Sequence, residues 1–106
     1  SFGQSVQDTG PYVEETLTVI TEPSGARVQI NDAFMGYSPV TASVRRYWRG
    51  VSGSMVLDQV KIEALPSADG QCAQGGFFGE ASRKVVSPVR FSMTSCSAGT
   101  EAREGA

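Results

Sequence analysis

LTVITEPSGARVQINDAFMGYSPVTASV, residues 17–44, is the stretch that decides the fold of this chain. Hydrophobic side chains alternate with polar ones in Leu17–Glu22, in Ala26–Asn31 and again in Val40–Val44. A period of two at β-branched positions is typical of half-buried strands. The stretch therefore predicts three consecutive strands joined by two reversals.

Turn-forming residues separate the three predicted strands. Pro23 and Gly25 lie in the first reversal, where the fixed φ of proline and the positive φ open to glycine favour a type II turn with Pro23 at its second position. Asn31 opens the second reversal and Gly36 closes it. Pro39, which cannot donate to a β-ladder, follows before the third strand.

This pattern resembles the PEGA domain family, a group of small β modules named for a Pro-Glu-Gly-Ala-like turn. The chain departs from the family pattern at Ser24, Asp32 and Ser38, where Glu, Gly and Thr are usual. The resemblance covers about a quarter of the chain and rests on the turns and the short strand between them: Pro23-Ser24-Gly25-Ala26, Val28-Gln29-Ile30-Asn31, Gly36 and Ser38-Pro39.

PEGA-like modules recur in cell-envelope and surface proteins of prokaryotes, often as pieces of lipoproteins, and they are not known as catalytic units. The resemblance thus implies a non-catalytic β module of the envelope and supplies no catalytic residues.

The length of 106 residues suits one domain with a modest core. We expect an all-β fold of six or seven short, mostly antiparallel strands, forming a small sandwich or an open barrel. Residues 15–96 would form this domain. Residues 1–14 would be an N-terminal arm, either mobile or docked on a partner, and residues 97–106 a polar C-terminal tail.

The second half of the chain predicts further strands. Met55–Leu65 is the longest candidate, with Asp58 interrupting its inward row, and Val89–Met93 is the last. Between them, Ser67–Glu80 is rich in glycine and reads as a long loop. Phe77-Phe78 would be a costly pair to expose, so at least one ring should return to the core.

The two cysteines, Cys72 and Cys96, have no histidine to join them in a zinc site and lack the Cys-x-x-Cys redox spacing. They could form a disulfide or remain free thiols. We favour the disulfide, which would close a loop of about 25 residues and contribute roughly 3–4 kcal/mol. Disulfides persist in oxidising compartments, so this predicts the periplasm or the cell surface, with outer-membrane association as one form of it.

Charge and hydropathy exclude several classes of partner. The net charge of −2 argues against binding to nucleic acid or to anionic lipid. No apolar run is long enough to span a membrane. No signal peptide is recognisable, but Ser1 is compatible with a mature end after processing and with a lipid anchor upstream of it.

Catalytic patterns are missing from the sequence. Histidine, the usual general base near neutral pH, is absent, and no serine lies in Gly-x-Ser-x-Gly. Glu14 and Glu15 are adjacent, so a strand would point them to opposite faces. Asn31-Asp32 lacks the carboxylate spacing of a calcium loop. We expect no enzyme activity, no cofactor and no metal.

One cluster, Arg45–Arg49, mixes cations with large aromatic rings, the residue types enriched at binding hot spots. Tyr47 and Trp48 could cap the core beside solvated arginines, contact a partner or stack on a sugar. The predicted protein interface comprises Phe34, Tyr37, Arg46, Tyr47, Trp48 and Arg49.

Two functions fit these observations. The first is a structural or interaction module, an accessory subunit of a cell-envelope assembly that binds other envelope proteins through its rings, arms and sheet edges. The second is a carbohydrate-binding module for peptidoglycan or a surface polysaccharide, which would require coplanar exposed rings.

Overall fold

The computed structural model describes residues 11–96, and this part of the chain is all-β, as predicted. Its strands outnumber the six or seven expected, and the first begins early enough to include residues 12–14, which we had assigned to the arm. The strands are β1 Tyr12–Glu22, β2 Arg27–Ile30, β3 Ala33–Tyr37, β4 Val40–Arg49, β5 Val56–Leu57, β6 Val60–Leu65, β7 Gln74–Phe78 and β8 Val89–Ser92. Within these residues no helix has the length and apolar character of a membrane span.

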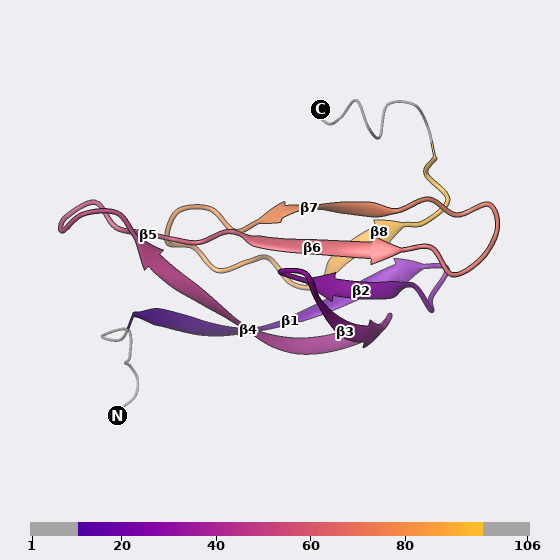
Figure 1. The fold of residues 1–106 in the computed structure, drawn as a ribbon, viewed down its shortest axis with the longest axis horizontal. Coiled ribbons are helices and arrows are strands. Elements are labelled where there is room, and N and C mark those ends of the chain that lie inside the picture. Colours follow the sequence, from indigo (N-terminus) through magenta and orange to yellow (C-terminus); the bar gives the residue numbers. More distant parts are fainter. Residues whose placement is uncertain (1–10, 97–106) are drawn as a thin grey trace.

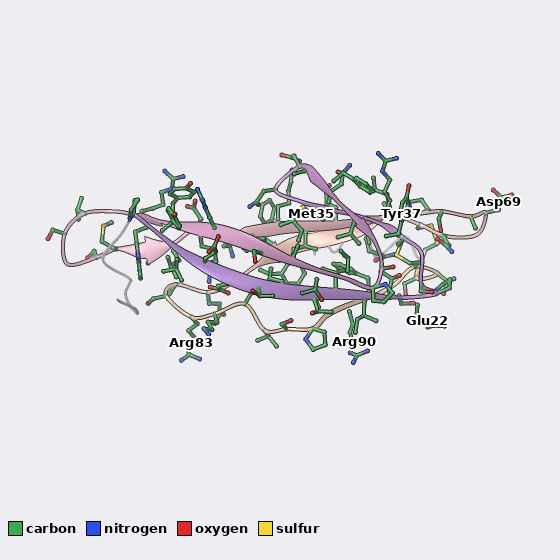
Figure 2. The ribbon with its side chains drawn as sticks, turned by 90° about the horizontal axis from the view of Figure 1, so that it is seen from below. Glu22, Met35, Tyr37, Asp69, Arg83 and Arg90 are labelled. Carbon is green, nitrogen blue, oxygen red and sulfur yellow. A yellow bond between two sulfur atoms is a disulfide. The ribbon has the colours of Figure 1, made fainter. Side chains whose placement is uncertain are left out.

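The strands form two four-stranded sheets, ordered β5-β4-β1-β8 and β3-β2-β6-β7 (Figure 1). All ladders are antiparallel except that of β1 with β8, which is parallel. Figure 2 shows the two layers edge-on, with Tyr37 of β3 on one side and Glu22 and Arg90 of the other sheet opposite. Hydrophobic residues from both sheets and one from the segment before β8, Val85, meet between the layers: Leu17, Val19, Val28, Ile30, Val44, Val60, Ile62, Val85 and Val89.

The second reversal is tighter than the sequence suggested. Asn31 and Asp32 have φ values of 51° and 71° and form a two-residue turn, with Ile30 paired to Ala33 across it. Positive φ at both central positions is the geometry that matches the twist of a hairpin. Because the turn is complete at Asp32, Gly36 does not close a reversal as predicted but lies within β3.

The first reversal is fixed by a buried hydroxyl. Ser38 Oγ accepts hydrogen bonds from the backbone N–H groups of Gly25 and Ala26, at 3.1 and 3.0 Å, and also shares a hydrogen bond with Thr21 Oγ1. The positive φ of 94° falls on Gly25 and not on Ser24, so the predicted type II turn is not formed. Ser38 supplies a hydroxyl where the PEGA pattern usually has Thr, and either residue could make these bonds.

The glycine-rich segment is not a loop throughout. Residues 74–78 form β7, which pairs with β6 along its whole length. Phe78 returns to the core, with its ring 6.0 Å from that of Phe91, whereas Phe77 points outward and is 65% exposed. The expectation that one ring of the pair returns inward is confirmed. Glycine is unfavourable inside strands, and this hid β7 from sequence reasoning.

A disulfide joins Cys72 and Cys96, with their Cα atoms 5.5 Å apart, as predicted. It links the segment before β7 to the segment after β8. The backbone N–H of Cys72 also donates to Met93 O at 2.8 Å, so the two sheets are tied together at this edge by covalent and hydrogen bonds.

A buried ion pair joins the two long strands to the irregular segments beside them. Arg46 Nη1 of β4 lies 2.8 Å from Glu15 Oε2 of β1, and Arg46 is fully buried. The same guanidinium donates to the carbonyls of Asp58 and Arg83, at 2.7 and 2.6 Å. Glu15 Oε1 accepts from the N–H of Val85 at 3.0 Å.

We predict that Glu15→Gln lowers the free energy of unfolding by about 3–5 kcal/mol, because it leaves the buried Arg46 charge without its counter-charge. Chemical denaturation of the two proteins measures the difference. The matched control is Glu14→Gln, next along β1, whose side chain is exposed. It should change stability by no more than about 0.5 kcal/mol. Equal effects of the two substitutions would contradict this role for the pair.

We also predict that reduction of the Cys72–Cys96 disulfide lowers stability by about 3.5 kcal/mol, the chain-entropy value for a loop closed by residues 24 positions apart. Urea denaturation with and without reductant provides the measurement. The double variant Cys72→Ser/Cys96→Ser should behave like the reduced protein and be insensitive to reductant.

Candidate functional site

The solvent face of the β1–β4 ladder carries two aromatic rings and a cation. Tyr12 lies opposite Tyr47 and Glu14 lies opposite Arg45 in the antiparallel register. The two rings have centroids 5.4 Å apart, and the Arg45 guanidinium lies 4.5 Å from the centroid of the Tyr12 ring. We call these four residues the β1–β4 aromatic face.

Charge on this face is held in place. A hydrogen bond to Tyr47, together with interaction with Tyr12, raises the pKa of Arg45. Glu14 lies 3.9 Å from Arg45, so a carboxylate balances the guanidinium. The face therefore presents rings and a fixed cation with little net charge, which suits a mixed apolar and polar partner better than a strongly charged one.

Arg49 ends β4 in a two-pronged contact with Asp58. Arg49 Nε and Nη2 donate to the two carboxylate oxygens at 2.7 and 3.1 Å. This hydrogen bonding lowers the pKa of Asp58 and raises that of Arg49. Arg49 is exposed, as an interface residue requires, but its guanidinium already has a partner.

Strand alternation divides the predicted cluster between two faces. Tyr47 points outward, whereas Arg46 and Trp48 point toward the inside of the sandwich. Arg46 has no exposed surface, so its assignment to a protein interface is wrong. Trp48 is partly buried and lies opposite Leu57, which favours the core-cap interpretation for this ring.

Phe34 and Tyr37 form a second, separate patch on the other sheet. Their rings meet edge to face with centroids 5.4 Å apart, and the Arg27 guanidinium lies 5.1 Å from the centroid of the Phe34 ring. β3 ends at Tyr37, just before β4 starts at Val40, whereas Tyr47 lies seven residues beyond that start, roughly 20 Å along the strand. Phe34 and Tyr37 therefore do not adjoin Tyr47 as we had expected.

Three of the four members of the β1–β4 aromatic face were missed by sequence reasoning. Tyr12 and Glu14 fall in the predicted arm, and Arg45 is absent from the predicted interface. The only sequence signal is that Arg45 and Tyr47 share a face by alternation. Their pairing with Glu14 and Tyr12 depends on the hairpin register, which single-sequence patterns do not reveal.

The exposed rings and charges of the described residues offer surfaces for recognition. Between residues 11 and 96, no group of three or more His, Cys, Asp or Glu side chains gathers to hold a metal ion. Adjacent Glu14 and Glu15 lie on opposite faces, the first exposed and the second buried in its ion pair. What the arrangement can do is bind, by ring contact, cation–π contact and hydrogen bonds.

Residues 14–46 match the family model of the PEGA domain, from the start of β1 to the middle of β4. The match confirms the resemblance drawn from the turns. Searches of the curated proteins and of the solved structures found no match.

We predict that Arg49→Gln raises the pKa of Asp58 toward its usual value of 3.8, because the Arg49 hydrogen bond is the main cause of the lowered value. A lowered pKa in the folded state stabilises the fold above the unfolded value, and this contribution is lost as the pH falls through the folded value. Acidification below about pH 4 should therefore remove stability that the variant already lacks. Following the Asp58 carboxyl carbon by NMR from roughly pH 6 to 2 tests this.

The control for this titration is Arg45→Gln, another exposed arginine on the same face of β4, which makes no contact with Asp58. It should leave the Asp58 titration unchanged. A midpoint that responds equally to both substitutions would refute a specific effect of Arg49.

Proposed function

Starting from the PEGA-like domain that this chain contains, we propose that it is a non-enzymatic protein-interaction module, an accessory component of a prokaryotic cell-envelope assembly. The observation that carries the proposal is the β1–β4 aromatic face, where Tyr47 and Arg45 are exposed and Tyr12 is half-buried on the ladder of the two longest strands. Tyrosine and arginine are among the residues that most often dominate the energy of protein interfaces.

The contacts within this face favour binding because they fix it in advance. Tyr12 and Tyr47 pack on each other, and Arg45 is held by the Tyr12 ring and by Glu14. Side chains that are already ordered lose less conformational entropy when a partner docks. Farther along the same ladder the outward residues are small and polar, with Thr18 and Thr41 hydrogen-bonded at 2.9 Å. The rings thus lie at one end of the ladder, beside polar residues of the kind found at the rim of an interface.

The ring geometry favours a protein partner over a sugar. The planes of Tyr12 and Tyr47 are inclined by 59°, and those of Phe34 and Tyr37 by 71°. Neither pair offers the coplanar platform on which successive sugar rings would stack. Tilted rings instead suit insertion of irregular side chains between and beside them.

The location that we propose is the periplasm or the cell surface. A disulfide between Cys72 and Cys96 is consistent with an extracytoplasmic protein, because reducing compartments keep cysteine thiols in the reduced form. Attachment through a lipid upstream of Ser1, and association with the outer membrane, extend this proposal along the lines that PEGA-like modules suggest.

We predict that Tyr47→Ala weakens binding of this chain to its envelope partner by about 2 kcal/mol, the loss typical of a buried hot-spot ring. Tagged protein purified from the envelope, with quantification of each co-purifying polypeptide, identifies the partner, and titration with that purified partner gives the affinity. A photo-reactive amino acid at position 47 should cross-link the same polypeptide in intact cells.

The matched control is Phe34→Ala, which removes an exposed ring of the other sheet. It should leave the interaction within a factor of two. Binding lost equally in both variants, or cross-links to no protein from position 47, would refute the proposed face. Binding of the isolated domain to purified peptidoglycan or polysaccharide, abolished by Tyr47→Ala, would replace the protein partner by a carbohydrate.

A further inference from the structure

From Gly75 onward, β7 is an edge strand with no device that prevents strand pairing. Its N-terminal end is tied to the segment after β8, because Gln74 Nε2 donates to Ser95 O at 3.0 Å and a disulfide joins Cys72 to Cys96. β7 lies at the end of its sheet and pairs only with β6 along one side (Figure 1). Its sequence, Gln74-Gly75-Gly76-Phe77-Phe78, contains no charge, no proline and no bulge. Exposed edges without such features are templates for a further strand.

The other described edges are short, charged or irregular. β5 has two residues, and the N–H of Leu57 already donates to Ala81 O of the neighbouring loop. β3 pairs with β2 through a bulge at Val28/Gln29. β8 carries the exposed Arg90. β7 is therefore the edge of the described sandwich that is best suited to pair.

The outward face of β7 combines a hollow with a projecting ring. An open trough of about 350 Å³ lies over Gly75 and Gly76, bordered by Lys61, Glu63 and Phe77. It exists because residue 75 is glycine: a Cβ there would lie 3.0 Å from Ile62 O and 3.2 Å from Glu63 Cγ. Two residues further along the same face, Phe77 is 65% exposed.

The cation beside the trough does not guard it. Lys61 Nζ lies 2.7 Å from Asp32 in the β2–β3 turn, on the side of β6 away from β7. A lysine is charged at neutral pH in any case, and the hydrogen bond to Asp32 raises the pKa of Lys61 further. The lysine side chain therefore extends from β6 toward the β2–β3 turn and not across β7.

We propose that two copies of this chain pair antiparallel through β7, about a two-fold axis at Gly76. In this register Phe77 of each copy lies opposite Gly75 of the other, with the paired positions about 5 Å apart. Each ring then fills the trough of the other copy. Because the hollow and the ring are two residues apart on one strand, the edge is complementary to itself, which is the requirement for a two-fold interface.

The commitment to a second copy rests on this self-complementarity. A strand from an unrelated protein would satisfy the backbone of β7, but it would need its own ring at the right position to fill the trough. The same chain supplies that ring automatically. The surface is distinct from the β1–β4 aromatic face, which lies on the other sheet, so self-association and partner binding are separable.

The pairing surface is small, so the dimer should be weak and concentration-dependent. A five-residue strand and one ring per copy fall below the area of standard stable interfaces. Sedimentation velocity on the whole chain, between roughly 10 μM and 1 mM, should show a monomer–dimer equilibrium. Phe77→Lys should raise the dissociation constant at least ten-fold, since it removes the ring and adds a charge to the edge.

The matched control is Phe34→Lys, which changes an exposed ring on β3 of the same sheet and should leave the equilibrium within a factor of two. Isotope-filtered NMR on a mixture of differently labelled unmodified chains supplies a second measurement. It should detect contacts between the Phe77 ring protons of one copy and the Gly75 Hα protons of the other.

A monomer throughout the concentration range would overturn the proposal. So would a dimer that persists in Phe77→Lys, or intermolecular contacts that map to another surface. Loss of self-association in Phe77→Lys should leave the cross-linking from position 47 intact. A failure of the dimer and a failure of the proposed partner function would therefore be told apart.

Discussion

The rest of the structure depends on the ion pair between Glu15 and Arg46. A guanidinium without solvent needs a counter-charge and acceptors for its N–H groups. Here Glu15 provides the counter-charge and two backbone carbonyls accept from Nε and Nη1, while Nη2 has no hydrogen-bond partner among the described residues. The second oxygen of Glu15 is bound by the N–H of Val85. Two segments that lie outside the strands, at Asp58 and at residues 83–85, are thereby fastened to the centre of the longest ladder.

This pair also specifies the register of β1 against β4. Side chains on a strand alternate between faces, so a slip of one residue would turn Arg46 toward solvent and bring Arg45 or Tyr47 into the core. In the slipped register Glu15 and Arg46 would lose each other as partners, so the ion pair favours the observed pairing of β1 with β4. The register that buries Arg46 is the one that sets Tyr47 beside Tyr12 and Arg45 beside Glu14 on the outer face. The inner ion pair and the outer aromatic face are consequences of one alignment.

Sequence reasoning was reliable where the pattern was periodic and local. The alternation was sufficient to find β1, β2, β4 and β8, although β1 begins at Tyr12, before the predicted Leu17, and β4 continues to Arg49, beyond the predicted Val44. The disulfide, favoured over free thiols because no other chemistry was visible for the two cysteines, is present. Sequence reasoning failed where a residue departs from the usual behaviour of its type. Gly36 was read as a turn because glycine favours turns, yet the turn was already complete at Asp32. Arg46 was read as exposed because arginine usually is, and its buried partner Glu15 is distant in sequence.

The two glycines of β7 weaken the strand and also shape its outer surface. Gly75 and Gly76 contribute no side chain to hold the strand in its sheet, so its position depends on β6 and on the nearby disulfide at Cys72. The missing side chains also leave the outer surface of the strand hollow beside an exposed ring. A substitution that strengthened β7 by filling position 75 would collide with β6 and close the hollow. The two glycines therefore cause both the weak strand propensity of this segment and the hollow at its edge. The disulfide offsets the weak propensity, whereas nothing in the strand fills the hollow.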